Sequence, residues 1–164
     1  SRPYRDRRYL HLVCRKGVVM IEQHYGELCI DDALHTSLEA LLNRYTLPEN
    51  AERLVLNCRQ VSYYRHRQGI HPIEVQFKRE STSSPWLVVF FASFSYPDDN
   101  STTVEPELYF HLANRWCYQP DVGNTDLSHP EVQELLSVWM KAFARHLSRN
   151  VFDDVQLTMV GTFQ

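Results

Sequence analysis

Apolar residues recur at helical spacing along residues 31–47, and this pattern predicts a first helix. Asp31 or Asp32 can cap its N-terminus, and Pro48 and Asn50 end it. The apolar residues fall on one stripe, as expected for a helix that packs against a core. They are Leu34, Leu38, Leu41, Leu42 and Tyr45.

A second and longer helix is predicted to begin near Ser128 and to stop at Asn150. Ser128 and Glu131 have the spacing of a capping box, and Pro130 lies in the first turn, where its missing N–H costs nothing. Basic side chains gather at the C-terminal end, which suits the helix dipole. The apolar face consists of Val132, Leu135, Leu136, Trp139, Met140, Phe143 and Leu147.

Strands are predicted where apolar and polar residues alternate, at 54–59, 73–78, 107–112 and 151–159. The run at 86–96 is apolar on both faces where it begins, which predicts a central strand covered above and below. Residues 116–123 are interpreted as irregular, because Pro120 and Gly123 break regular structure.

This order of elements predicts an α+β fold: a mostly antiparallel sheet of about five strands, with two helices packed on one face. Residues 31–164 are expected to form a single domain. Residues 1–30 are expected to be an N-terminal extension that contains a basic arm and a hairpin over residues 9–21, with a short buried helix over residues 18–25 as the alternative. The doubly apolar strand implies that this extension, or a dimer partner, covers part of the other face.

Charge is distributed unevenly along the 164 residues. Residues 1–16 contain six basic residues and one acidic residue, a net charge of +5, whereas the whole chain carries -3. Such an arm can bind nucleic acid or simply remain solvated. No apolar run approaches the roughly 18 residues of a membrane helix, so no membrane contact is expected and the cytoplasm is the default location.

Four widely spaced cysteines do not form a disulfide framework. His11 and Cys14, followed by His24 and Cys29, are ligand types of a structural zinc site, but Leu12 and Val13 between the first pair favour a strand and ordinary packing. We therefore expect no metal and no cofactor. Cys58 and Cys117 are expected to be small buried side chains.

The segment 62–75 holds the densest group of aromatic, arginine and histidine side chains in the sequence. Aromatic rings and cations together suit single-stranded nucleic acid or phosphate, yet the acidic body of the chain opposes that use. The simpler interpretation is a surface loop whose tyrosines fold back onto the sheet. The candidate binding residues are Tyr63, Tyr64, Arg65, His66, Arg67, His71 and Tyr96.

His71 is the one residue around which an enzyme is conceivable. His71 and Glu74 lie three apart, so a strand would place them on opposite sides, and no pair of them is expected. A structural role is favoured, in which Pro72 begins an outer strand and His71 closes the loop. A hydrolase or metal-dependent enzyme would need Tyr63, Tyr96 or Asp98 close to His71.

Several phrases resemble a bacterial family known as domain of unknown function 2787, over about residues 31–160. They are Ser62-Tyr63, Gly69-Ile70-His71-Pro72-Ile73-Glu74-Val75, Phe94-Ser95-Tyr96, Ser137-Val138-Trp139 and Val151-Phe152-Asp153-Asp154-Val155. The resemblance implies a small α+β bacterial domain, often encoded in accessory or mobile-element genes, without an established activity. It implies no catalytic residue. The chain departs from the family at residues 64–67, where the family is more acidic and Gly-rich, and in residues 1–30.

The sequence therefore favours a non-catalytic binding or accessory module whose partner is a protein, acting as a monomer or a homodimer. A nucleic-acid-binding protein that uses the arm and the Tyr/Arg loop is the first alternative. An enzyme centred on His71 is the second.

Overall fold

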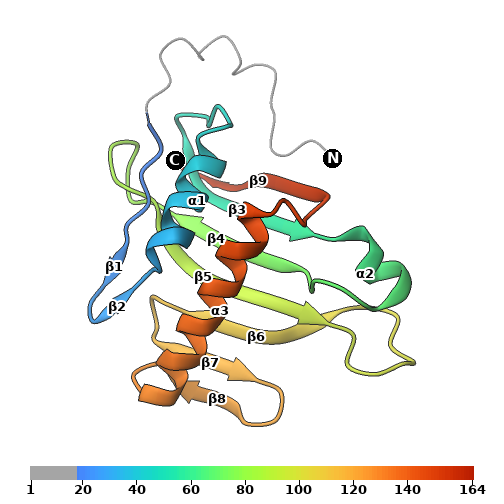
Figure 1. Ribbon diagram of the computed structural model, residues 1–164. Helices are drawn as coiled ribbons and strands as arrows, with labels where there is room; N and C mark the ends of the chain where they lie inside the picture. The colour runs from blue at the N-terminus through green and yellow to red at the C-terminus, as the bar shows by residue number, and fades with distance from the viewer. Residues whose placement is uncertain (1–17) are drawn as a thin grey trace.

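The computed structural model describes residues 18–164, which form one large antiparallel sheet with helices on one face (Figure 1). The strands of the sheet follow the order β8-β7-β6-β5-β4-β3-β9, and a short hairpin, β1-β2, lies apart. The strands are β1 His24–Tyr25, β2 Leu28–Cys29, β3 Ala51–Arg59, β4 Ile73–Lys78, β5 Leu87–Ser95, β6 Glu105–His111, β7 Trp116–Gln119, β8 Gly123–Asp126 and β9 Asp154–Thr162. The helices are α1 Asp32–Leu42, α2 Val61–His66 and α3 Pro130–Ser148.

The α+β architecture is confirmed, but the sheet has seven strands rather than about five. Strands β7 and β8 occupy residues 116–126, much of which the sequence led us to interpret as irregular. The predicted central strand is correct, since β5 has three strands on each side. Among residues 18–164, no helix is long and apolar enough to cross a membrane.

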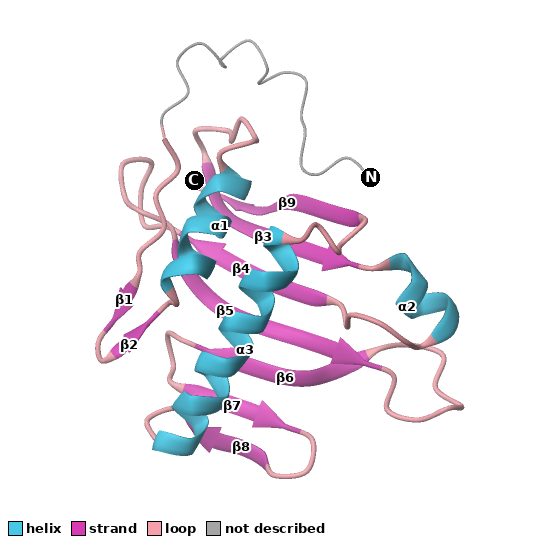
Figure 2. Cartoon of the chain, viewed as in Figure 1, coloured by secondary structure: helices cyan, strands magenta, loops and turns pink. Residues whose placement is uncertain are grey.

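Helices α1 and α3 lie across the same face of the sheet (Figure 2). The main core fills the space between these two helices and the sheet. Their buried residues, such as Leu38 and Phe143, are those of the predicted apolar stripes. The side chain of Asp31 accepts a hydrogen bond from the N–H of Leu34, which confirms one predicted cap. The predicted capping box is wrong: α3 begins at Pro130 after His129, without a side-chain cap.

Residues 18–30 pack on the helix side of the sheet. Ile21 forms a parallel bridge with Trp86 and donates its N–H to Glu39 of α1. Leu28 and Ile30 are buried in the main core. This part of the N-terminal segment therefore does not cover the other face. The basic arm, and most of the predicted hairpin at 9–21, lie outside the described residues.

The sheet consequently has a second face on which no element of residues 18–164 packs. Its centre is a small separate cluster formed by Val89, Phe90 and Ala92, with Phe94 and Tyr109 packed beside them. We call this the open face.

Candidate binding surface

The first part of the predicted Tyr/Arg loop is a short helix of six residues, α2, that closes one end of the sheet. Tyr63 points inward and is only 3% exposed. Its ring stacks on Tyr96 at 5.6 Å and lies 4.7 Å from the ring of His71. The Tyr63 hydroxyl accepts a hydrogen bond from the N–H of Tyr96 at 3.2 Å. The tyrosine therefore belongs to the interior, as a folded-back side chain would.

Tyr64 lies edge-on to both neighbouring tyrosines, so the four rings of Tyr63, Tyr64, His71 and Tyr96 form one group, here called the end cluster. Arg67 places its guanidinium 3.8 Å above the ring of Tyr96 and covers it. The left-handed backbone of Arg67 (φ 59°) ends α2. Arg65 and His66 are exposed beside this cluster. Five of the seven predicted residues are thus brought together.

His71 pairs with Glu107 of β6, which sequence spacing did not reveal. The Nδ1 atom of His71 lies 2.9 Å from Oε2 of Glu107, and the hydroxyl of Ser93 donates to the same oxygen at 3.1 Å. The hydrogen bond that His71 donates to Glu107 raises the pKa of His71. Burial acts to raise the pKa of Glu107, but the bond and charge of His71 outweigh it and lower that pKa. Both shifts favour the charged, hydrogen-bonded form of the pair.

This geometry corrects the predicted role of His71. The residue ties β4 to β6 across β5 rather than closing its own loop, and β4 is an interior strand, not an outer one. The hydroxyl of Ser93 points to Glu107 and not to the imidazole, so histidine is not placed to take its proton, as a serine nucleophile requires. Glu74 lies on the open face, away from His71, as expected.

The His71 pair lines a pocket of about 250 Å³ between β4–β6 and α3. Its walls are otherwise mainly apolar, with Trp139 and Phe143 from the helix. The pair is its main polar feature.

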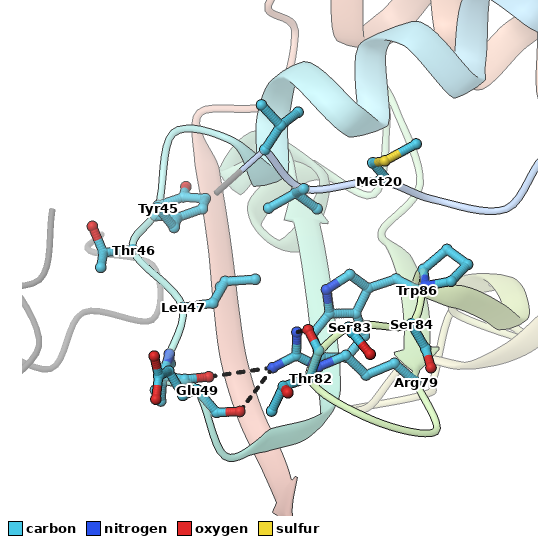
Figure 3. Close-up of a pocket in the computed structure, with 14 residues that line it drawn as sticks. Met20, Tyr45, Thr46, Leu47, Glu49, Arg79, Thr82, Ser83, Ser84 and Trp86 are labelled. Carbon is cyan, nitrogen blue, oxygen red and sulfur yellow. Dashed lines mark hydrogen bonds between the residues drawn. The ribbon is translucent and has the colours of Figure 1, made fainter. Parts of the chain in front are cut away.

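A larger pocket of about 540 Å³ lies at the opposite end of the sheet, between residues 45–49 and 82–86 (Figure 3). Arg79 lies within this pocket, and its guanidinium makes hydrogen bonds and a ring contact within the protein. It donates to the carbonyl oxygens of Ala51, Pro48 and Glu49 and stacks 4.4 Å from Trp86. Arg79 therefore fixes the two loops that form the pocket.

The open face carries a second group of rings that sequence analysis missed. Tyr109 stacks on Trp116 at 4.9 Å with an interplanar angle of 7°, and on Phe90 at 4.6 Å. His111 lies 5.4 Å from Trp116 at 14°. These four residues, from β5, β6 and β7, are here called the open-face cluster. Tyr118 faces the same side, since it pairs directly with Tyr109.

The surroundings of the open-face cluster are mixed in charge. Burial and the nearby charge of Lys78 lower the pKa of His111, so the ring is neutral at pH 7 and stacks without a charge. Burial raises the pKa of Glu74, and burial together with Glu74 raises that of Tyr109. Partial burial thus favours the uncharged forms of the side chains on this face.

The zinc hypothesis involves residues on both sides of the described boundary. His11 and Cys14 lie outside the described residues, whereas His24 and Cys29 face each other across the β1-β2 hairpin. Within residues 18–164, no group of three or more histidine, cysteine or acidic side chains could hold a metal ion. Cys58 and Cys117 are fully buried, as predicted, and burial raises the pKa of the Cys58 thiol to about 12.

The fold defines a small α+β domain with helices on one face of an antiparallel sheet. A family model described as a protein of unknown function, DUF2787, matches residues 32–158, and the chain belongs to that family. No curated protein matches the chain.

Two solved structures share the fold. One is a conserved hypothetical protein from pathogenicity island VPI-2 of Vibrio cholerae, described as sharing structural homology with the human P32 protein. It is 23% identical, with a TM-score of 0.70, over 85% of this chain and 100% of that one. The other is a hypothetical protein from the Vibrio cholerae VSP-II pathogenicity island, 20% identical, with a TM-score of 0.74, over 87% of this chain and 99% of that one.

Proposed function

We propose that this protein is a non-catalytic module that binds another protein through the open face of its sheet. The observation that carries the proposal is the open-face cluster, four stacked rings on a face that no described element covers. Tyrosine, tryptophan and phenylalanine are enriched at the buried centres of protein interfaces and supply most of the binding energy there. Preassembled rings also lose little conformational entropy on contact.

A protein partner suits the charge of this face better than a nucleic acid does. Arg59 is paired with Asp154 at 3.8 Å, and Glu74 and Asp126 offset Lys78 and Arg53. The chain as a whole carries a net charge of -3. Affinity for nucleic acid depends mainly on cations that meet the phosphate backbone, and this face offers no excess of them.

The origin of both structural neighbours in pathogenicity islands supports an accessory role, carried out in the cytoplasm. The His71 pair supports a structural role at this site, because His71 Nδ1 and the Ser93 hydroxyl both bond the same oxygen of Glu107 and so link neighbouring strands.

Site-specific photocrosslinking in the native bacterium tests the proposal. A photoreactive phenylalanine derivative at Tyr118 reports on the open face, and the same group at Val138, an exposed position on α3 (55%), is the matched control. We expect a discrete crosslinked protein from position 118 and none from position 138. Equal labelling from both positions, or crosslinks to nucleic acid instead of protein, would overturn the proposal.

A further inference from the structure

The two edges of the sheet differ in how they are protected. One edge is β8, which has four residues and ends at the exposed Asp126. The other is β9, which has nine residues and pairs with β3 along one side. No strand among residues 18–164 pairs with its second side. Short strands and charged side chains are the usual protections of a sheet edge, and β8 has both.

Strand β9 lacks these protections. Its nine residues include no proline, lysine or arginine, and its only charged residue is Asp154 at the very start. Thr158 is exposed, and Val160 is an apolar side chain exposed to 51%. The pairing with β3 shifts register near Gly161, a bulge that twists the far end. The six residues Asp154–Met159 pair with β3 one for one and leave a regular edge.

An edge of this kind presents a row of backbone N–H and C=O groups, and a partner must bring an extended strand to satisfy them. We propose that this partner is the β9 strand of a second copy of the chain, paired antiparallel about a twofold axis. The inference goes beyond the binding function of the open face and does not depend on it.

The charges and side chains of β9 suit pairing with itself. In an antiparallel pair the two Asp154 carboxylates lie at opposite ends, so the single charge of each strand meets no like charge. The residues between them are uncharged, and threonine and β-branched side chains form favourable cross-strand pairs. A twofold arrangement pairs the free backbone edge of β9 in both copies at once. The assembly therefore stops at a dimer and does not grow further.

The dimer would join two seven-stranded sheets into one continuous sheet. Directly opposed residues of an antiparallel pair point to the same side, so both open faces would look the same way. A dimer would therefore offer two open-face clusters to one partner surface. Once the first cluster is bound, the second is held at a high effective concentration, which would increase the overall affinity for the partner.

Sedimentation velocity of the full chain, from low micromolar to high micromolar concentration, tests the inference. We expect a concentration-dependent dimer in the wild type and a monomer in the double variant Thr158→Lys, Val160→Lys, whose symmetry-related cations repel. Val138→Lys makes a similar change on α3 and is expected to leave the dimer intact. Far-ultraviolet circular dichroism confirms that each variant is folded.

Amide hydrogen exchange of the wild type gives a readout that needs no variant. Dimerisation predicts that the outward-pointing amides among residues 155–159, which donate no hydrogen bond to β3, exchange at least several-fold more slowly at high protein concentration than at low concentration, while those of β8 do not change. A wild type that stays monomeric throughout would overturn the inference and leave β9 to a strand of another protein. A dimer that survives the double lysine variant would overturn it too, because its interface would lie elsewhere.

Discussion

The end cluster and the open-face cluster are both groups of stacked aromatic residues, yet only the end cluster is covered and hydrogen-bonded by the surrounding structure. In the end cluster, the Tyr63 hydroxyl accepts a hydrogen bond from the N–H of Tyr96, and Arg67 covers the ring of Tyr96. His71 is hydrogen-bonded to Glu107. In the open-face cluster the rings cover mainly one another. The first group holds the sheet end together, and the second leaves apolar area that no element of residues 18–164 covers, which is why we propose it as the binding surface. Aromatic density in the sequence therefore indicated the end cluster and not the open-face cluster.

The largest expected effect of any single change is in the end cluster. Tyr63→Ala removes a ring that is only 3% exposed, and large-to-small changes at such sites cost roughly 3–5 kcal/mol. Urea denaturation measures this loss as a lower free energy of unfolding. Tyr63→Phe is the control: it removes only the acceptor of the Tyr96 N–H bond and is expected to cost about 1 kcal/mol.

In the open-face cluster, the same kind of truncation should cost much less stability. Tyr109→Ala breaks the stacks with Phe90 and Trp116, and an aromatic pair contributes about 1 kcal/mol beyond its buried area. We expect a loss of about 1–2 kcal/mol in the same urea titration. A loss as large as that of Tyr63→Ala would show that the open face behaves as a closed core, which contradicts the comparison.

The His71–Glu107 pair predicts a pH dependence of stability that comes from two groups whose charged forms the fold favours, whereas burial on the open face favours the uncharged forms of His111 and Glu74. The folded state raises the pKa of His71 above its ordinary 6.5, so its contribution is complete below pH 6.5 and is lost as pH rises through the folded-state value. The folded state lowers the pKa of Glu107 below 4.5, so that contribution is complete above pH 4.5 and is lost as pH falls.

His71→Gln is therefore expected to destabilise the protein most between pH 4.5 and 6.5, and less at higher and lower pH. Because both side chains are about one-third exposed, the pH-dependent part should stay below about 1 kcal/mol. Thermal unfolding of the variant and the wild type across pH 4 to 9 measures it. A difference that is constant over this range would refute the charged pair.

The smallest effect is expected at the exposed rim of the end cluster. Arg65→Ala removes an exposed side chain, and such changes alter stability by no more than about 0.5 kcal/mol. The urea midpoint should equal that of the wild type. A clear loss of stability would show that Arg65 belongs to the closed group with Arg67.

Much of the fold was predictable because its signals are local. The apolar run of β5 indicated a central strand, and the stripes of α1 and α3 indicated helices that share one face. The strands β7 and β8 were missed because they are four residues each and β8 is polar, so neither shows a clear alternation. Helix α2 was missed because six residues are too few to show a helical period.

The open-face cluster could not be predicted, because the sheet register creates it. Phe90, Tyr109 and Trp116 are spread over 27 positions, and they meet only because β5, β6 and β7 pair as they do. The partner of His71 was missed for the same reason, since Glu107 lies 36 residues away. An alternating pattern of Tyr109 and His111 on one side of β6 was the one signal that could have pointed to an exposed aromatic face.

The most direct test of the open face as a binding surface is the crosslinking yield at position 118, measured with and without Trp116→Ala in the same chain. We expect Trp116→Ala to abolish most of the crosslinked product while the protein stays folded, because Trp116 stacks on both Tyr109 and His111. An unchanged yield in a folded Trp116→Ala protein would contradict the account.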